Sequence, residues 1–247
     1  VWQGTHRLTS RDYFAAANAR NTGLCLAPDG WIAYVDDLSV LMPGWLAAVR
    51  EGMAEGRVTL GAYRKVNDIT VRDGLLDSFT PSGNDPRSIA GWDSRYHMTT
   101  ADVSRAYDSW FFGCSALVPV ETFLCVNGYE EDCDGMCFED IITGLYFAAA
   151  GVPLWYDKRM LIYEDDYKHF QAGGAPIRRN VVYPDGSEYP DACWRILGEV
   201  RSGKRTRSTT YPEPLAAIRK RVLAGESFPL ATEPLTSWQD GTPLSEL

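Results

Sequence analysis

The stretch at residues 30–46 constrains the fold most, because its character changes twice over a short span. It begins with aromatic and apolar residues from Trp31 to Val35, which predict a buried strand. Two adjacent carboxylates follow, Asp36 and Asp37, and Pro43 stands at a position where a helix tolerates proline. The order therefore predicts a strand, an acidic turn and a helix.

The acidic pair has two explanations. Carboxylates at the end of a buried strand repel each other and lose hydration, and a divalent cation that itself holds a diphosphate would relieve both costs. Alternatively, both acids stabilise the N-terminus of the following helix through its dipole. Asp36 and Asp37 alone leave both explanations open.

Two further blocks flank this stretch. Ser10 is a good N-cap and Gly23 a good C′ residue, so a helix is expected over 11–22, and it contains Ala-Asn-Ala-Arg-Asn-Thr-Gly at 17–23. The second block has a strand at 111–119, then Asn-Gly-Tyr-Glu-Glu at 127–131, and a helix that starts with Glu139 and Asp140. Taken alone, Arg20 is explained as a surface residue and the two acids as favourable charges at a helix N-terminus.

Together these blocks resemble the GT-A glycosyltransferases, family 2 in particular, over roughly residues 9–170. In that family an Asn-x-Arg-Asn-x-Gly helix leads into a strand that ends in an acidic motif. A Gly-Gly-Tyr/Phe-Asp/Glu-Glu stretch later precedes a Glu-Asp pair at a helix start. The resemblance implies a GT-A fold, an α/β Rossmann-like architecture with a mixed central sheet flanked by helices.

The resemblance also implies an activity: inverting transfer of a sugar from a nucleotide-diphosphate sugar to a hydroxyl acceptor, which would be a glycan, a lipid-linked acceptor or a polymer. Asp140 would be the general base and Glu139 would orient the acceptor. The donor would contact Arg20, Asn21, Asp36, Asp37 and Gly113, and the acceptor would contact Glu139 and Trp110. A divalent metal, Mn²⁺ or Mg²⁺, would be held by Asp37, Asp36 and His169.

One position departs from the family. The acidic motif is commonly Asp-x-Asp, but Leu38 stands here where the last acid is expected. A metal-independent enzyme is therefore one alternative. A catalytically inactive GT-A-like scaffold that binds a sugar or a nucleotide is another.

The sequence predicts two regions, and the family resemblance predicts a further part before them. Residues 1–170 would form the catalytic domain, but the strand, helix and strand with which a family 2 enzyme begins are absent, so an N-terminal part is expected to be missing. Residues 171–247 would form a partly helical C-terminal extension, with helices near 191–201 and 212–224, on the acceptor side or in assembly; a homo-oligomer stays open. The long polar stretch at 65–100 predicts a loop.

Composition limits which classes of partner and which cellular compartment are expected for the chain. The net charge of −9 disfavours nucleic-acid binding, although residues 201–207 are locally basic and are interpreted as a solvated face, with steering of a polyanionic acceptor as the alternative. No apolar run approaches ~20 residues, so no transmembrane helix is expected. The six cysteines lack the spacing of a metal site, and Cys25, Cys114 and Cys125 are expected to be buried free thiols, which favours a reducing, cytoplasmic compartment.

Overall fold

A computed structural model describes residues 16–36, 38–82, 88–133, 138–166, 191–211 and 213–226. Contacts divide the chain into two units. The helical unit consists of Val1–Gly30, Val120–Ala150 and Pro176–Leu247, and the sheet unit of Trp31–Pro119 and Gly151–Ala175. The predicted boundary at residues 170 and 171 lies outside the described residues.

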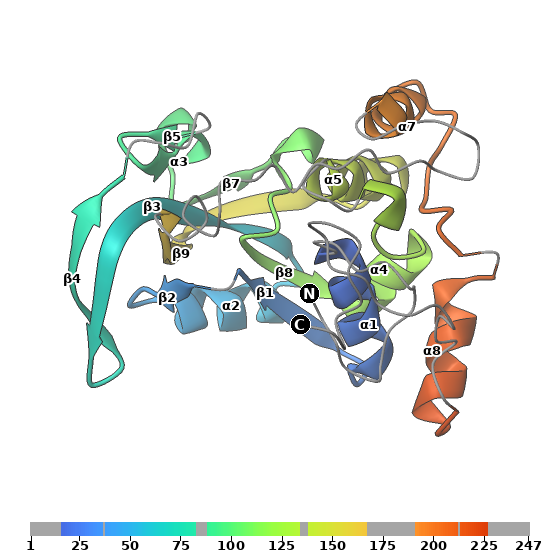
Figure 1. The fold of residues 1–247 in the computed structure, drawn as a ribbon, viewed down its shortest axis with the longest axis horizontal. Helices are drawn as coiled ribbons and strands as arrows, with labels where there is room; N and C mark the ends of the chain where they lie inside the picture. The colour runs from blue at the N-terminus through green and yellow to red at the C-terminus, as the bar shows by residue number, and fades with distance from the viewer. Residues whose placement is uncertain are drawn as a thin grey trace, which may run out of the picture. The chain divides into compact units, whose positions relative to one another are not determined.

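The described part of the sheet unit contains one mixed sheet of nine strands. Its strands are β1 (Trp31–Val35), β2 (Ser39–Leu41), β3 (Val58–Arg72), β4 (Leu75–Pro81), β5 (Ser88–Ile89), β6 (Trp92–Asp93), β7 (Val103–Arg105), β8 (Ser115–Pro119) and β9 (Leu154–Asp165). Strands β3 and β9 pair in parallel, whereas β8 runs antiparallel to its neighbours β1 and β3 (Figure 1). The chain is therefore a mixed α/β protein, which confirms the coarse prediction of fold class.

Helix α2 (Trp45–Ala54) packs on this sheet, as the sequence after Pro43 predicts. Trp45, Ala48 and Val49 are buried because their spacing places them on one face of the helix. They join a core cluster with Leu117 of β8 and Ile162 of β9. This packing anchors the segment that follows the acidic turn.

The prediction of a loop at 65–100 is wrong. Strand β3 continues to Arg72 and returns as β4 through Asp73-Gly74, both at positive φ (52° and 77°) (Figure 1). Asp-Gly is a strong hairpin signal, because glycine adopts positive φ without steric cost and aspartate tolerates it. The polar composition of the stretch reflects the exposed faces of the hairpin rather than a lack of regular structure. Helix α3 (Ser94–Met98) and a 3₁₀ turn, η1 (Asp108–Trp110), complete this part of the unit.

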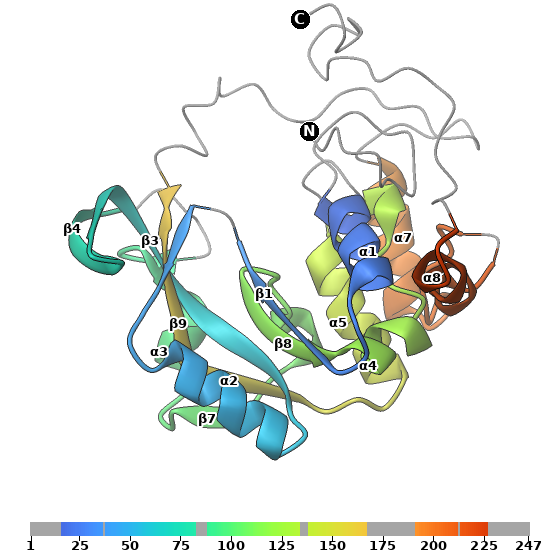
Figure 2. The same ribbon diagram turned by 90° about the horizontal axis from the view of Figure 1, so that it is seen from below.

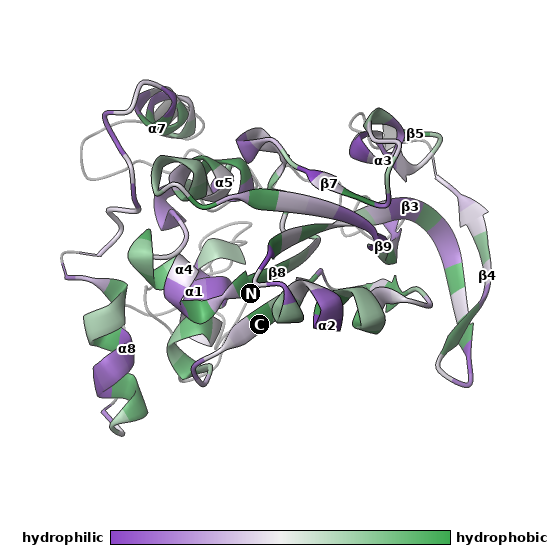
Figure 3. Cartoon of the chain, turned by 180° about the vertical axis from the view of Figure 1, so that it is seen from behind, coloured by the Kyte–Doolittle hydropathy of each residue, from purple (hydrophilic) through white to green (hydrophobic). Residues whose placement is uncertain are grey.

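The helical unit gathers α1 (Ala16–Leu26), α4 (Val120–Cys125), η2 (Glu131–Cys133), α5 (Glu139–Ala149), α7 (Asp191–Arg201) and α8 (Leu215–Leu223) (Figure 2). Phe123 lies in its core, with ring centroids 5.1 Å from Tyr129 and 5.3 Å from Phe147. Helix α8 carries both hydrophobic and hydrophilic residues along its length (Figure 3), and it buries Leu215 and Ile218. The helices expected near 191–201 and 212–224 are therefore present, the second one shorter than predicted.

Two local expectations change. Helix α1 continues through Gly23, which was expected to end it. Cys25 and Cys114 are buried free thiols as expected, but Cys125 is exposed because it lies at the end of α4. No helix in the described ranges is long and apolar enough to cross a membrane.

Candidate functional site

Helix α1 presents a polar face to the interior of the helical unit. Asn18 and Asn21 are both buried, and their i, i+3 spacing places them on the same side. The amide nitrogen of Asn21 donates to Glu131 Oε1 at 2.8 Å and to the carbonyl of Tyr129 at 3.1 Å. Its amide oxygen accepts from the backbone N–H of Tyr129 at 2.8 Å. Asn18 donates to the other oxygen of Glu131 at 3.1 Å. The first sequence block thus binds directly to the second.

The turn before Tyr129 makes this contact possible. Gly128 has a φ of 76°, and a Cβ atom at this position would clash with Oδ1 of Asn21 and with the side chain of Leu215. Glycine is therefore favoured at this position for two reasons: it adopts the left-handed conformation, and its lack of a side chain lets Asn21 approach the backbone. The Asn-Gly pair was expected only to end α4, but its glycine also makes room for the Asn21 side chain.

The acids Glu130 and Glu131 are fully buried and hydrogen-bonded within the helical unit. Glu130 accepts from Tyr146 Oη, Arg205 Nη1 and Thr210 Oγ1, each at 2.9 Å. Burial and the Glu130 carboxylate together raise the pKa of Tyr146 above its usual range, so this tyrosine remains a hydrogen-bond donor. These two carboxylates therefore have a structural role: they hold the segment around Tyr129 against its neighbours in the helical unit.

Arg20 links α1 to the first turn of α5. Its Nη1 lies 2.5 Å from Oδ1 of Asp140 and 3.7 Å from Oε1 of Glu139, and its guanidinium lies over the Tyr129 ring at 5.2 Å. The Glu139 residue is 8% exposed, whereas the Asp140 side chain is 25% exposed. A partly exposed carboxylate, oriented by a guanidinium at a helix N-terminus, can accept a proton from a neighbouring hydroxyl.

The predicted residues Asp36, Gly113 and Trp110 belong to the sheet unit. The backbone N–H of Asp36 donates to the carbonyl of Cys114 at 3.0 Å, so Asp36 and Gly113 lie near each other at the ends of the paired strands β1 and β8. The carbonyl of Trp110 accepts from Nη1 of Arg95 at 2.6 Å. Leu38 has a φ of 57° and is 42% exposed.

The proposed metal ligands are only partly described. Asp36 has a described position, whereas Asp37 and His169 lie outside the described residues. Within the part of the chain that the structure describes, no group of three or more histidine, cysteine or acidic side chains is placed to hold a metal ion. Metal binding by Asp36, Asp37 and His169 therefore stays a prediction.

Sequence reasoning missed the segment after α7 as part of this arrangement. Arg205 and Thr210 bind Glu130, and the hydroxyl of Tyr211 donates to Glu131. These partners are 75 to 80 positions apart in the chain. The basic and hydroxyl-rich composition of the segment was visible, but nothing local indicates which acids it reaches.

No family model matches this chain, and no curated protein matches it. A function for the chain therefore rests on its own residues and their geometry.

Proposed function

We propose that this protein is a family 2-like GT-A glycosyltransferase. It transfers a sugar from a nucleotide-diphosphate sugar to a hydroxyl acceptor, with inversion and with Asp140 as general base. One observation carries the proposal: Arg20 of the first block lies 2.5 Å from Asp140 of the second. Two stretches that resemble the same family, far apart in the chain, thus meet at the residue expected to perform the chemistry.

The proposed reaction is a single displacement. Asp140 takes the proton of the acceptor hydroxyl as the acceptor oxygen bonds to the anomeric carbon of the donor. The bond between that carbon and the diphosphate oxygen breaks, and the nucleoside diphosphate leaves with the electron pair. Because the attack comes from the face opposite the leaving group, the anomeric configuration inverts.

Three residues have supporting roles. Arg20 fixes the orientation of the Asp140 carboxylate. A general base needs such a fixed orientation, because it must lie within hydrogen-bond reach of the proton that it takes. Glu139 lies beside Asp140 in the first turn of α5, and its Oε1 lies 3.7 Å from the same Arg20 nitrogen, so both carboxylates border one guanidinium. Glu139 would bind the acceptor hydroxyl, as the family resemblance implies, and Asn21 holds the Tyr129 backbone under Arg20.

The donor side of the proposal rests on Asp36, Asp37, Gly113 and Arg20, with Trp110 on the acceptor side. A divalent metal held by Asp36, Asp37 and His169 would offset the charge of the leaving diphosphate. Of these three proposed ligands, Asp36 alone has a described position.

Leu38 in place of the last acid of the motif favours the second candidate, an inactive scaffold that binds a sugar or a nucleotide. A screen of nucleotide sugars with the full-length protein separates the two candidates. Release of nucleoside diphosphate that depends on an acceptor supports the enzyme. Saturable binding of the donor with no release, over a panel of hexose acceptors and at both Mg²⁺ and Mn²⁺, supports the scaffold.

A further inference from the structure

The helical unit contains a pocket of about 510 Å³, lined by Glu199, Lys204, Arg205, Thr206, Arg207 and Thr209. We call it the basic pocket. Its volume falls within the roughly 300–1,000 Å³ that small-molecule sites occupy. Its lining differs from a typical site, because every lining residue is polar or charged and half of them are cations. Such a lining suits a strongly hydrophilic anion.

Backbone contacts on both sides hold the pocket segment in place. The N–H groups of Lys204 and Arg205 donate to the carbonyl of Glu199 at 2.9 and 3.2 Å, which turns the chain sharply after α7. Farther on, the N–H of Ser208 donates to the carbonyl of Val126 at 2.9 Å, and its hydroxyl donates to the carbonyl of Tyr129 at 3.0 Å. The cations between these anchors are therefore presented by an ordered turn rather than by a free loop.

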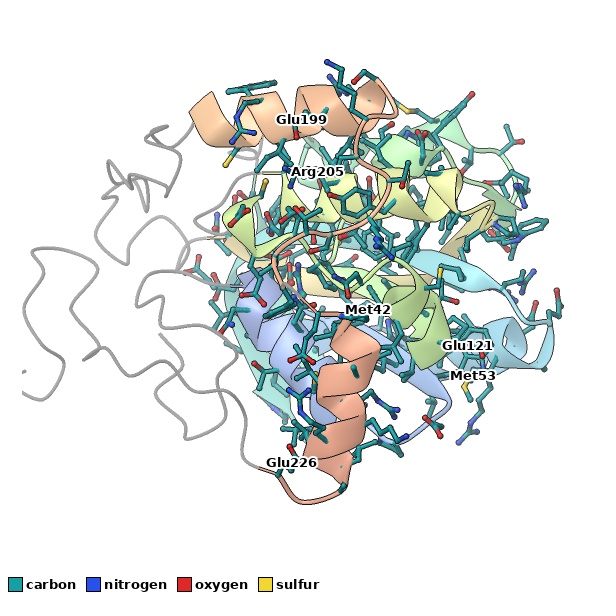
Figure 4. The ribbon with its side chains drawn as sticks, turned by 90° about the vertical axis from the view of Figure 1, so that its right-hand side faces the viewer. Met42, Met53, Glu121, Glu199, Arg205 and Glu226 are labelled. Atoms are coloured by element: carbon teal, nitrogen blue, oxygen red, sulfur yellow. The ribbon has the colours of Figure 1, made fainter. Side chains whose placement is uncertain are left out.

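The cations of the pocket differ in how many carboxylates they bind. Arg205 binds two carboxylates, Glu130 through Nη1 at 2.9 Å and Glu199 through Nη2 at 3.0 Å. Arg205 and Glu199 are labelled in Figure 4. Lys204 and Arg207 are exposed and form no ion pair with any residue that the structure describes. The pocket therefore has a local excess of positive charge, although the net charge of the chain is −9.

We infer that the basic pocket binds a phosphate-type oxyanion, carried by a molecule of about the size of a sugar phosphate. Arginine and lysine are the side chains that bind phosphate oxygens most strongly, through charge-assisted hydrogen bonds. The hydroxyls of Thr206 and Thr209 line the same space and can donate to the remaining oxygens. A lone phosphate would leave most of the volume empty, so an uncharged organic remainder fits beside it.

The test compares two double variants of the full-length protein. Lys204→Gln with Arg207→Gln removes the two unmatched cations of the pocket. Arg201→Gln with Lys220→Gln makes the same change in net charge at exposed positions of the helical unit that do not line the pocket. Calorimetry measures binding of inorganic phosphate, a hexose phosphate and the free hexose, while circular dichroism and thermal unfolding check that both variants are folded.

We expect both phosphates to bind the wild-type protein and the free hexose not to bind. The pocket variant should lose about tenfold or more in affinity, since two charge-assisted contacts are removed. The control should stay within about twofold, as for exposed charges without a specific contact. Tighter binding of the hexose phosphate than of inorganic phosphate supports the larger ligand. Equal weakening in the two variants, or no binding of either phosphate, overturns the inference. Binding is measured without turnover, so the result stands apart from that of the glycosyltransferase screen.

Discussion

Arg20 and Asp140 form an ion pair across 120 positions of sequence, with Nη1 and Oδ1 2.5 Å apart. Arg20 comes from the helix before the first strand of the sheet unit, and Asp140 from the first turn of α5. Folding of the helical unit therefore determines how the proposed base is oriented. The pair also means that a change at either residue alters the environment of the other.

Replacement of Asp140 tests the proposed base. Asp140→Asn keeps the size and hydrogen bonding of the side chain but cannot take the acceptor proton, so turnover should fall by ~10²-fold or more. Donor binding should change little, and Glu121→Gln, at an exposed acid of α4, is the matched control. Steady-state kinetics and the anomeric configuration of the product are the measurements. A near-normal rate, or a product of retained configuration, would contradict this role.

Asn21→Ala tests the contact between α1 and the Tyr129 segment. The variant leaves buried groups of Glu131 and Tyr129 without the amide that binds them, so the free energy of unfolding should fall by about 1–3 kcal/mol. Urea denaturation followed by circular dichroism measures it. Glu121→Ala, at an exposed site in the same unit, should change it by less than about 0.5 kcal/mol. Equal effects of the two variants would show that Asn21 makes no net contribution.

Two glycines should respond in opposite directions to alanine. A Cβ at Gly61 of β3 would overlap Ser115 Oγ and the carbonyl oxygen of Met160, so Gly61→Ala should cost about 1–3 kcal/mol. Gly198 lies in α7 with nothing within 4 Å of an added Cβ, so Gly198→Ala should gain about 0.5–1 kcal/mol of helix stability. Thermal unfolding compares them. A stable Gly61→Ala protein would mean that β3, β8 and β9 pack less closely than described.

Alkaline stability should depend on Cys25. Burial raises the pKa of its thiol to about 12, whereas the thiol of an unfolded chain ionises near 9. Between these pH values the folded state keeps a proton that the unfolded state releases, so the free energy of unfolding falls as pH rises. Cys25→Ala should show a shallower decrease over this window in denaturant titrations. Parallel pH profiles for the variant and the wild-type protein would exclude this linkage.

Metal binding is tested at the three proposed ligands. Asp37→Ala should abolish metal-dependent donor binding, Asp36→Ala should weaken it, and His169→Ala should lower Mn²⁺ affinity by ~10-fold or more with the fold intact. Calorimetry with Mn²⁺ and a nucleoside diphosphate measures each variant. Unchanged affinity in Asp37→Ala would favour the helix-dipole explanation of the acidic pair.

Elements with strong local signals were predictable. The strand β1, the helix α2 after Pro43, and the helix α5 that begins with Glu139 all appear where periodicity and end signals place them. The β3–β4 hairpin was missed because polar residues on its exposed faces hid the alternation, although Asp73-Gly74 carried the turn signal. The prediction that Gly23 ends the first helix was wrong, because glycine within a helix is tolerated when the surrounding residues pack well.

The sequence by itself determined several single elements, among them β1, α2 and α5, and the two blocks that resemble one family, because these depend on neighbours within a few positions. Only the tertiary structure decided that Asn21 binds the Tyr129 backbone, that Arg20 meets Asp140, and that Arg205 binds Glu130. Each of these contacts satisfies a polar or charged group that is buried or partly buried, and its partner comes from a distant part of the chain. Burial makes such pairing obligatory, but local residue preferences do not specify which partner the fold brings.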